Sequence, residues 1–282
     1  MQDLCDLQSQ LKGDLPNARS TFSRPFTNTG VDFAGPFDVK SFVGRGCYTT
    51  KGYVCVFVCF STKAIHIEAT TDLTAEKFLE AFSRFVARRG CPLHMYSDNG
   101  ETFVRASSIL SKDLVESTRN LILTTHSHQG IKSFKTHFYK TVSSVKYTYD
   151  KLSTLLTKIE ACLNSRPLSP MSEDVSDLVA LTPGHFLIRR PLLSMAEPES
   201  REDVESIRNA GNGSRLSISI SIGDMVIIRE ENIPPQEWRL GRVLTTCPGA
   251  DKRVRVVDIQ TCRGVFHRPV AKLVLLPTGP TL

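Results

Sequence analysis

The feature that most constrains the fold is an uninterrupted apolar segment, Tyr53–Phe60, flanked by two shorter segments that are rich in β-branched and aromatic residues. The flanking segments are GVDFAGPF at 30–37 and AIHIEAT at 64–70. A strand that is apolar at every position has no face that suits water. The sequence therefore predicts at least these strands, with the middle one inside a covered sheet.

A helical pattern follows directly. The segment LTAEKFLEAFSRFVARRG, residues 73–90, carries its large apolar residues at helical spacing. Thr74 is placed to cap the helix and Gly90 to stop it, and both basic residues of the last turn suit a helix C-terminus. This segment is predicted to be an α-helix.

Strands and helices alternate further along the chain. The patterns predict a strand at 93–97, a helix over 101–119, a strand at 120–125 and helices over 131–145 and 152–163. Strands first, then strand and helix in alternation, indicate an α/β layer fold.

The C-terminal part has a different pattern. Residues 193–221 are rich in Glu, Ser, Arg, Asn and Gly, which is typical of a linker. Short strand-like segments follow at roughly even spacing, at 222–231, 238–246, 252–260 and 265–276. Their pattern predicts a small β-barrel.

Composition excludes several classes of protein. The longest strongly apolar run is too short to cross a bilayer, and residues 1–20 lack the apolar stretch of a signal peptide, so an intracellular protein without a membrane partner is expected. The eight cysteines include no Cys-x-x-Cys pair and lie mostly in apolar runs, as reduced buried thiols do. The net charge of +6 permits a polyanionic partner without requiring one.

Two aspartates stand out. Asp32 lies between Val31 and Phe33 in a predicted strand and therefore belongs to the opposite face, whereas Asp98 follows the strand at 93–97. Strand ends of an α/β sheet gather at one edge, where two carboxylates repel unless they share a divalent cation. Phosphoryl transfer is the chemistry that such a site suits. The alternative is a turn aspartate, because Asp-Asn-Gly is common turn chemistry.

Several longer segments resemble one family. RPFTNTGVDFAGPF, YSDNGETF, LSTLLTKIEACLNSRPLSP, ALTPGHFLI and IPPQEWRLGRV, with RVVDIQT and HRPVAKLVLLP, occur in order over most of the chain. Together they are similar to the integrase segment of a BEL/Pao-type retrotransposon polyprotein. The resemblance implies an RNase H-like mixed sheet with flanking helices, followed by a small SH3-like β-barrel. It also implies a DDE metal triad that joins DNA ends to a target, in which Asp32 and Asp98 match the first two acids.

The third acid of that triad has no counterpart. The family's glutamate lies early on the helix after the fifth strand, but residues 117–149 contain neither Asp nor Glu. Glu101 and Glu116 stand at other places and are expected at the solvated surface, and Glu68 is expected to pair with a neighbouring Lys or Arg. The third catalytic acid is therefore unknown, and the site is expected to be catalytically impaired.

Basic residues indicate where nucleic acid would bind. The acid-free window carries Lys132, Lys135 and Lys140, and the predicted barrel has a surplus of cations that includes Arg239, Arg242, Arg253 and Arg255. Such residues neutralise phosphates, although a plain solvated surface accounts for the barrel cations nearly as well.

The sequence thus predicts an N-terminal extension (1–21), an integrase catalytic-core-like domain (22–192), a linker (193–221) and a small β-barrel domain (222–282). The resemblance implies Mg²⁺ or Mn²⁺ as cofactor if the protein is active, and DNA as partner, both the element's ends and the target. It leaves a homo-oligomer open and suggests action in the nucleus. The alternatives are a non-catalytic DNA-binding or protein-docking remnant and an RNase H-like nuclease.

Overall fold

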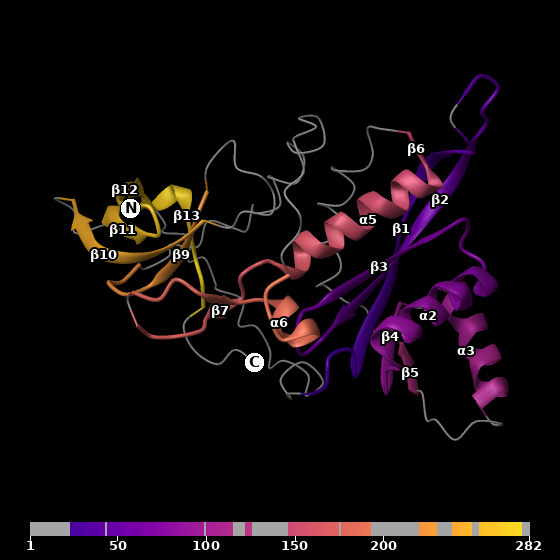
Figure 1. The fold of residues 1–282 in the computed structure, drawn as a ribbon. Helices are drawn as coiled ribbons and strands as arrows, with labels where there is room; N and C mark the ends of the chain where they lie inside the picture. Colours follow the sequence, from indigo (N-terminus) through magenta and orange to yellow (C-terminus); the bar gives the residue numbers. More distant parts are fainter. Residues whose placement is uncertain are drawn as a thin grey trace, which may run out of the picture.

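The computed structural model describes residues 23–42, 44–98, 100–114, 122–125, 146–174, 176–192, 220–229, 239–249 and 254–277. We call the described residues up to 192 the first unit and those from 220 onward the second unit (Figure 1). The extension 1–21, the helical pattern 131–145 and nearly all of the linker 193–221 lie outside the described residues. The division of the chain into four segments therefore stays a prediction.

A mixed sheet forms the centre of the first unit. Its path runs β3-β2-β1-β4-β5, and a short sixth strand, β6, pairs with the far end of β1. The strands are β1 (Asn28–Lys40), β2 (Thr49–Cys59), β3 (Ile65–Thr70), β4 (His94–Ser97), β5 (Ile122–Thr125) and β6 (Tyr147–Thr148).

The strand directions define the fold class. β1, β2 and β3 form an antiparallel meander, whereas β4 pairs with β1 in parallel and β5 pairs with β4 in parallel. An antiparallel meander followed by parallel strands on the other side of β1 is the RNase H-like arrangement. The mixed sheet predicted for this part of the chain is confirmed.

Helices cover both faces of this sheet (Figure 1). On one face, α2 (Ala75–Arg89) and α3 (Glu101–Leu114) contribute to a core that includes Phe57, Phe78 and Phe85. On the other face, α5 (Tyr149–Asn164) packs Leu152 and Leu156 against the sheet. β2 supplies residues to both cores, as its unbroken apolar sequence predicts.

The ends of α2 agree with the sequence pattern. The Thr74 hydroxyl accepts a hydrogen bond from the Lys77 backbone N–H at 3.4 Å. Gly90 follows the helix with φ of 87°, a backbone conformation that side chains other than glycine rarely adopt. The helix predicted from Thr74 to Gly90 is confirmed at both ends.

Several short elements were not predicted from the sequence patterns. The first unit also contains β7 (Ser169–Pro170) paired with β8 (Ala180–Leu181), and a six-residue helix, α6 (Pro183–Ile188). A two-residue strand has no period to detect, so only its tertiary pairing defines it. β1 is also longer than predicted, since it continues to Lys40.

The second unit is a five-stranded antiparallel sheet of order β12-β11-β10-β9-β13. The 3₁₀ turn η2 (Val270–Lys272) joins its last two strands. This order, with such a turn before the last strand, is that of an SH3-like barrel, which agrees with the fold expected there. The strands are β9 (Met225–Ile228), β10 (Leu240–Pro248), β11 (Val254–Thr261), β12 (Gly264–Pro269) and β13 (Leu273–Leu275).

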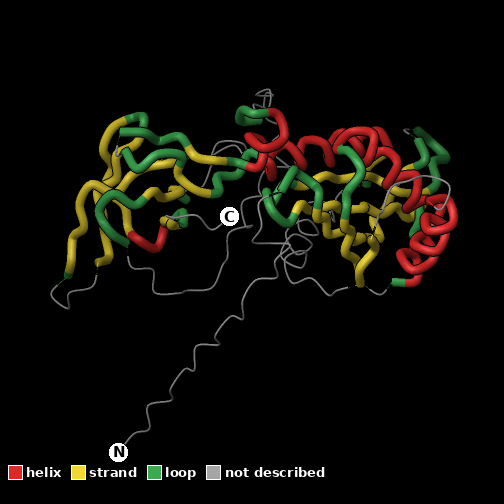
Figure 2. The backbone as a smooth tube through the Cα atoms, turned by 90° about the horizontal axis from the view of Figure 1, so that it is seen from below, coloured by secondary structure: helices red, strands yellow, loops and turns green. Residues whose placement is uncertain are grey.

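One close approach inside the second unit requires glycine. A Cβ atom on Gly241 of β10 would lie 2.2 Å from Cγ2 of Ile259 on β11. Because real Cβ atoms essentially never come so close, the sheet could not close over Ile259 with a larger residue there. In Figure 2 the second unit consists of strands and loops apart from one short helical turn, whereas helices line the first unit.

The two units contact each other through the β7–β8 segment. Ala180 of β8 packs with Met225 and Leu276 of the second unit in a small apolar cluster. Beside it, the Arg242 guanidinium donates hydrogen bonds to the backbone oxygens of Ser172 and Asp177 of the first unit.

The structure bears on two expectations drawn from composition, one about membrane-spanning helices and one about cysteines. Among the described residues, none of the helices has both the length and the apolar character needed to cross a membrane. The seven described cysteines are free, but only Cys55, Cys59 and Cys162 are buried. Cys247 and Cys262 are exposed, so the expectation of buried thiols was wrong for these two.

Candidate metal-binding edge of the central sheet

Asp32 lies within β1, the strand at the centre of the sheet. Its neighbours on the two sides show which face it occupies: Val31 belongs to the core under α2, and Ala34 belongs to the core under α5. Because side chains alternate along a strand, Asp32 shares the α5 face with Ala34. Asp32 is half-buried, and its Oδ1 accepts a hydrogen bond from the Phe33 backbone N–H at 2.7 Å.

Asp98 follows β4 directly and is exposed. Its Oδ1 accepts a hydrogen bond from the Gly100 backbone N–H at 3.2 Å, just before α3 begins at Glu101. Gly100 leaves room for this carboxylate, since a Cβ there would lie 3.1 Å from Asp98 Oδ1. The turn interpretation therefore accounts for one oxygen of Asp98 and leaves the other available.

The parallel register brings the two aspartates to neighbouring positions. Gly30 of β1 pairs with Tyr96 of β4, and Asp32 and Asp98 each lie two residues further along. Neighbouring strands of a sheet run about 4.8 Å apart. Asp98 comes directly after the end of β4, so the pair sits where the carboxyl end of that strand meets the middle of β1.

Two carboxylates at such a position are suitable ligands for a hard divalent cation. Mg²⁺ and Mn²⁺ take oxygen ligands, and Mg²⁺ keeps several waters, so Asp32 and Asp98 would supply two positions of its shell. Among the described residues there is no group of three or more His, Cys, Asp or Glu side chains that could hold a metal ion.

Two of the three other acids considered for this site are among the described residues. Glu101 is exposed on the first turn of α3, and Glu116 lies outside the described residues. Glu68 is buried on β3 and forms ion pairs with Arg84 at 2.7 Å and Arg88 at 2.7 Å. Glu68 therefore pairs with basic residues, as its strand-end position predicts.

Asp32 and Glu68 both influence the thiol between them. Burial raises the pKa of Cys55 well above its usual value, and the negative charges of Glu68 and Asp32 raise it further. Cys55 on β2 is paired with Phe33 on one side and with Glu68 on the other. Its thiol is therefore held in the protonated form and is inert toward a metal or an oxidant.

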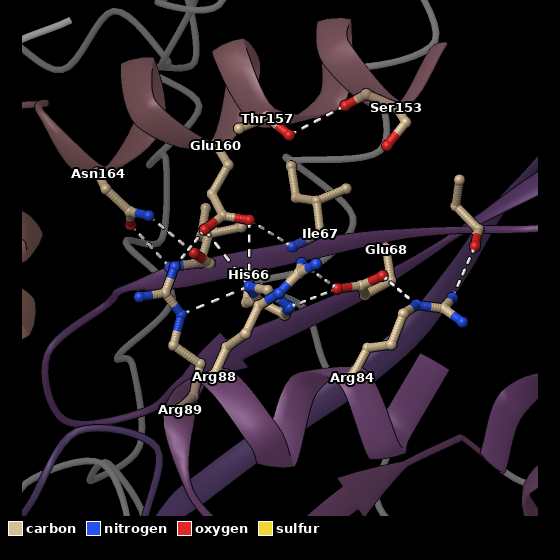
Figure 3. A network of polar contacts seen from close by, with 12 residues as sticks. His66, Ile67, Glu68, Arg84, Arg88, Arg89, Ser153, Thr157, Glu160 and Asn164 are labelled. Carbon is tan, nitrogen blue, oxygen red and sulfur yellow. Dashed lines mark hydrogen bonds and ion pairs between the residues drawn. The ribbon is translucent and has the colours of Figure 1, made fainter. Parts of the chain in front are cut away.

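Glu68 belongs to a larger group of charged side chains at the β3 edge of the sheet (Figure 3). In this group, two carboxylates on β3 and α5 meet a histidine on β3 and three arginines on α2. We call this group the β3-edge network; its members are His66, Glu68, Arg84, Arg88, Arg89 and Glu160.

His66 is the centre of the β3-edge network. Its Nε2 lies 3.0 Å from Glu68 Oε1, and its Nδ1 lies 3.2 Å from Glu160 Oε2. Burial acts to lower the pKa of His66, but the hydrogen bonds with Glu160 and Glu68 outweigh it and raise that pKa above the usual value. The imidazole is thus stabilised in its charged form between two carboxylates.

The two glutamates show the reverse effect. Burial acts to raise the pKa of each carboxyl group, but hydrogen bonds from His66 and the nearby guanidinium groups outweigh it. The pKa values of Glu68 and Glu160 are therefore both lowered, and both side chains are charged. Both carboxylates of the β3-edge network are paired with cations, which outnumber them, and neither carboxylate is left over for a metal.

Side chains of α5 also bond to the outer edge of β3. Glu160 Oε2 accepts a hydrogen bond from the Ile67 N–H at 2.9 Å. One turn later on α5, Asn164 accepts from the Ile65 N–H at 2.8 Å and donates to the Ile65 carbonyl at 2.8 Å. The Ile65 N–H and carbonyl and the Ile67 N–H, which an edge strand would otherwise present to solvent, are thereby satisfied.

The β3-edge network was not predicted from the sequence. Its signals were polar residues spaced one turn apart on two helices: Arg84 and Arg88 on α2, and Glu160 and Asn164 on α5. The pairing of α5 with β3 joins residues more than 90 positions apart, so no local pattern reveals it.

The predicted nucleic-acid-binding residues occupy different environments. Arg255 is exposed on β11, and Arg239 is half-buried. Arg242 is only 3% exposed, and its guanidinium donates to the carbonyl oxygens of Ser172, Asp177 and Gly223. The surface position expected for Arg242 is therefore wrong, because these carbonyls hold it at the junction of the two units. Lys132, Lys135, Lys140 and Arg253 lie outside the described residues.

Comparison with known proteins gives one family match. A family of unknown function, DUF5641, matches residues 200–276. No curated protein matches the sequence.

Solved structures that align with this chain at low identity include retroviral integrases. A simian T-cell lymphotropic virus intasome, in complex with the PP2A regulatory subunit B56 gamma, is 14% identical, covers 93% of this chain and 85% of its own, and has a TM-score of 0.36. The catalytic core domain of BIV integrase is 15% identical over 58% of this chain and 95% of its own, with a TM-score of 0.38. The HTLV-2 integrase catalytic core domain in complex with magnesium, in its trimeric form, is 16% identical over 58% of this chain and 97% of its own, with a TM-score of 0.36.

Proposed function

We propose that this chain is an integrase-like protein of a BEL/Pao-type retrotransposable element that binds DNA and descends from an enzyme of DNA integration. The ancestral reaction is metal-dependent phosphodiester strand transfer. The observation that supports the proposal is the register between β1 and β4, in which Asp32 and Asp98 follow the Gly30–Tyr96 pair by two residues each. Two acids at neighbouring strand positions are what a shared divalent cation requires.

In this proposal Asp32 and Asp98 hold Mg²⁺ or Mn²⁺. When bound, such an ion stabilises the charge that develops on phosphodiester oxygens. Asp32 is fixed by its pairing with Val56 of β2, and one of its oxygens is oriented by the Phe33 N–H. Asp98 is exposed at the strand end, where a DNA strand can reach it. The partners are the element's DNA ends and the target DNA, with other copies of the chain, and the proposed place of action is the nucleus.

We further propose that catalysis is impaired because the third acid of the triad is missing. The window 117–149, in which the family carries its glutamate, contains no Asp or Glu. Two carboxylates hold a divalent ion less firmly than three and leave its position less defined. The alternative function is a non-catalytic DNA-binding or protein-docking remnant that keeps the fold, and the same acid-free window favours it.

A strand-transfer assay tests the catalytic part. Purified protein is incubated with short DNA duplexes in Mg²⁺ and, separately, in Mn²⁺, and joined products are separated on a denaturing gel. Little or no product is expected. Robust product that disappears in Asp32→Asn, but persists in the exposed-site control Glu173→Gln, would show that the missing acid is supplied from elsewhere and that the protein is an active integrase.

A salt titration tests the binding part. Filter binding to a duplex at increasing salt should give an affinity that falls steeply, because each neutralised phosphate releases counterions. Binding that is absent at low salt, or that does not vary with salt, would contradict a phosphate-reading surface and leave the protein-docking remnant as the better account.

A further inference from the structure

The hairpin formed by β1 and β2 extends beyond the body of the first unit (Figure 1, upper right). Residues Val39 and Lys40 of β1 pair with Thr50 and Thr49 of β2, and Ser41 N–H donates to the Tyr48 carbonyl at 3.0 Å. The last contact with another strand is β6, which ends beside Lys40. We call residues 39–52 the hairpin arm.

Two aromatic side chains are exposed on the hairpin arm. Phe42 is 46% exposed and Tyr48 is 65% exposed. Between them, Gly44 and Gly46 both have positive φ, and a Cβ on Gly46 would meet no atom within 4 Å. The tip is therefore slender and open, and its two large apolar groups lie at the surface, where they gain nothing for folding.

The hairpin arm is also basic throughout. Between residues 39 and 52 the sequence contains Lys40, Arg45 and Lys51 and no acid. The nearest aspartate, Asp38, is matched by Lys146, whose Nζ lies 3.5 Å from Asp38 Oδ2. Asp38 also stands opposite Lys51 in the ladder, so this one aspartate faces two lysines and leaves the arm with a surplus of positive charge.

We propose that the hairpin arm binds duplex DNA, with its three cations on phosphates and Phe42 and Tyr48 against the groove. This inference rests on the proposed function and names a second place of contact. A two-stranded β-ribbon fits the major groove of B-DNA, and an acid-free basic ribbon is complementary in charge to its phosphates. Exposed aromatic rings offer the stacking and wedge contacts that nucleic-acid-binding proteins use.

The strand direction gives the arm a defined place relative to the Asp32–Asp98 edge. β1 runs parallel to β4, so the arm leaves the sheet in the direction in which Asp98 ends β4. Lys40 follows Asp32 by eight residues of β1. At about 3.3 Å per residue this is roughly 26 Å, or about eight base pairs along a duplex. DNA held at the two aspartates would therefore meet the arm less than one helical turn away.

Two arm variants separate the charged from the aromatic contacts. In the first, Lys40, Arg45 and Lys51 are each replaced by Gln; in the second, Phe42→Ser is combined with Tyr48→Ser. The matched control carries Lys158→Gln, Arg189→Gln and Arg190→Gln, which remove the same charge at exposed positions outside both the arm and the second unit. All are made in the full chain, and thermal unfolding checks that each variant stays folded.

Duplex affinity is then measured by filter binding over a range of salt concentrations. The slope of log affinity against log salt should become shallower by about 2 to 3 in the charge variant, since each lost phosphate contact removes about 0.9. The aromatic variant should lose about tenfold in affinity with an unchanged slope. A photo-reactive amino acid introduced at position 48 should crosslink to the duplex.

The outcomes distinguish this inference from the proposed function. If the wild-type protein does not bind duplex at low salt, both fail. If it binds with a steep salt dependence and both arm variants match the control, the arm inference alone is overturned. If the variants instead change the sedimentation of the protein without changing the salt slope, the arm is a contact between copies of the chain and the DNA assignment is wrong.

Discussion

Two pairs of acids on the same sheet show how differently a carboxylate can be used. Glu68 and Glu160, at the β3 edge, are buried and bonded to arginines and to His66. Asp32 and Asp98, on the two central strands, each accept a hydrogen bond from a backbone N–H within two residues. Glu68 and Glu160 contribute to the fold through ion pairs with His66 and with arginines of α2, whereas Asp32 and Asp98 are the pair that we propose for a shared cation. The ion-pair partners of the two glutamates come from other parts of the chain, which strand position alone does not reveal.

The largest effect on stability is expected when a carboxylate is removed from the β3-edge network. Glu160→Ala leaves Arg89 without its carboxylate, leaves His66 with Glu68 alone, and removes the acceptor of the Ile67 N–H. Loss of one member of a buried ion pair costs about 3 kcal/mol. Urea unfolding should show this loss, whereas the exposed Glu76→Ala on α2 should change stability by under about 0.5 kcal/mol. A loss as small as that of the control would mean that the network is not structural.

A second variant tests the hydrogen bonds from α5 to the edge of β3 separately from the ion pairs. Asn164→Ala removes both hydrogen bonds to Ile65 without altering the net charge. Two buried backbone groups are left without partners, and the expected loss is about 2 kcal/mol. Thr157→Ala on the same helix is the control, since its hydroxyl bonds only to the Ser153 carbonyl of its own helix. Equal stability of the two variants would show that water replaces Asn164 at no cost.

The free energy of unfolding should depend on pH through the titration of His66. Because its pKa is raised in the folded state, His66 contributes stability that is fully present below its unfolded pKa and is lost as pH rises through the folded value. Glu68 and Glu160 have lowered pKa values, so their contribution is present above the unfolded value and is lost as pH falls through the folded one.

Urea titrations at mildly acidic and mildly alkaline pH should therefore show lower stability at the alkaline end. His66→Phe should remove most of that decline and lower stability overall, whereas the exposed His267→Gln should leave the decline in place. A decline that is identical in His66→Phe would assign it to another group.

The smallest expected effect concerns the central aspartates. Addition of Mn²⁺ or Mg²⁺ at about ten times its dissociation constant should stabilise the protein by about 1.4 kcal/mol, a shift of a few degrees in melting temperature. Asp32→Asn and Asp98→Asn should each abolish the shift, whereas Glu68→Gln should lower the melting temperature and keep the shift. A shift that survives both aspartate variants would place the metal elsewhere.

Local patterns in the sequence predicted much of the fold. The apolar run of β2, the alternation around Asp32 and the caps of α2 each depend on residues within a few positions, and the structure agrees with them. The length of β1 and the strands β6, β7 and β8 depend on partners distant in the chain, and no local period marks them.

The candidate site shows the same division. Asp32 and Asp98 were found because each lies on or directly after a recognisable strand, and the metal that they would share stays a prediction. The β3-edge network was missed because its hydrogen bonds join β3 to residues 93 and 94 positions away on α5. Arg242 was misjudged because charge predicts exposure in general, and only the carbonyls around it show that this arginine is satisfied inside the protein.

The side chains of α5 that bond to β3 also limit how copies of this chain can associate. An uncovered edge strand invites another chain to pair with it and to extend the sheet from molecule to molecule. At β3 the Ile65 and Ile67 amides are already bonded to Asn164 and Glu160, so an incoming strand would have to displace these two side chains before it could pair there. Continuous sheet growth from the β3 edge is therefore disfavoured.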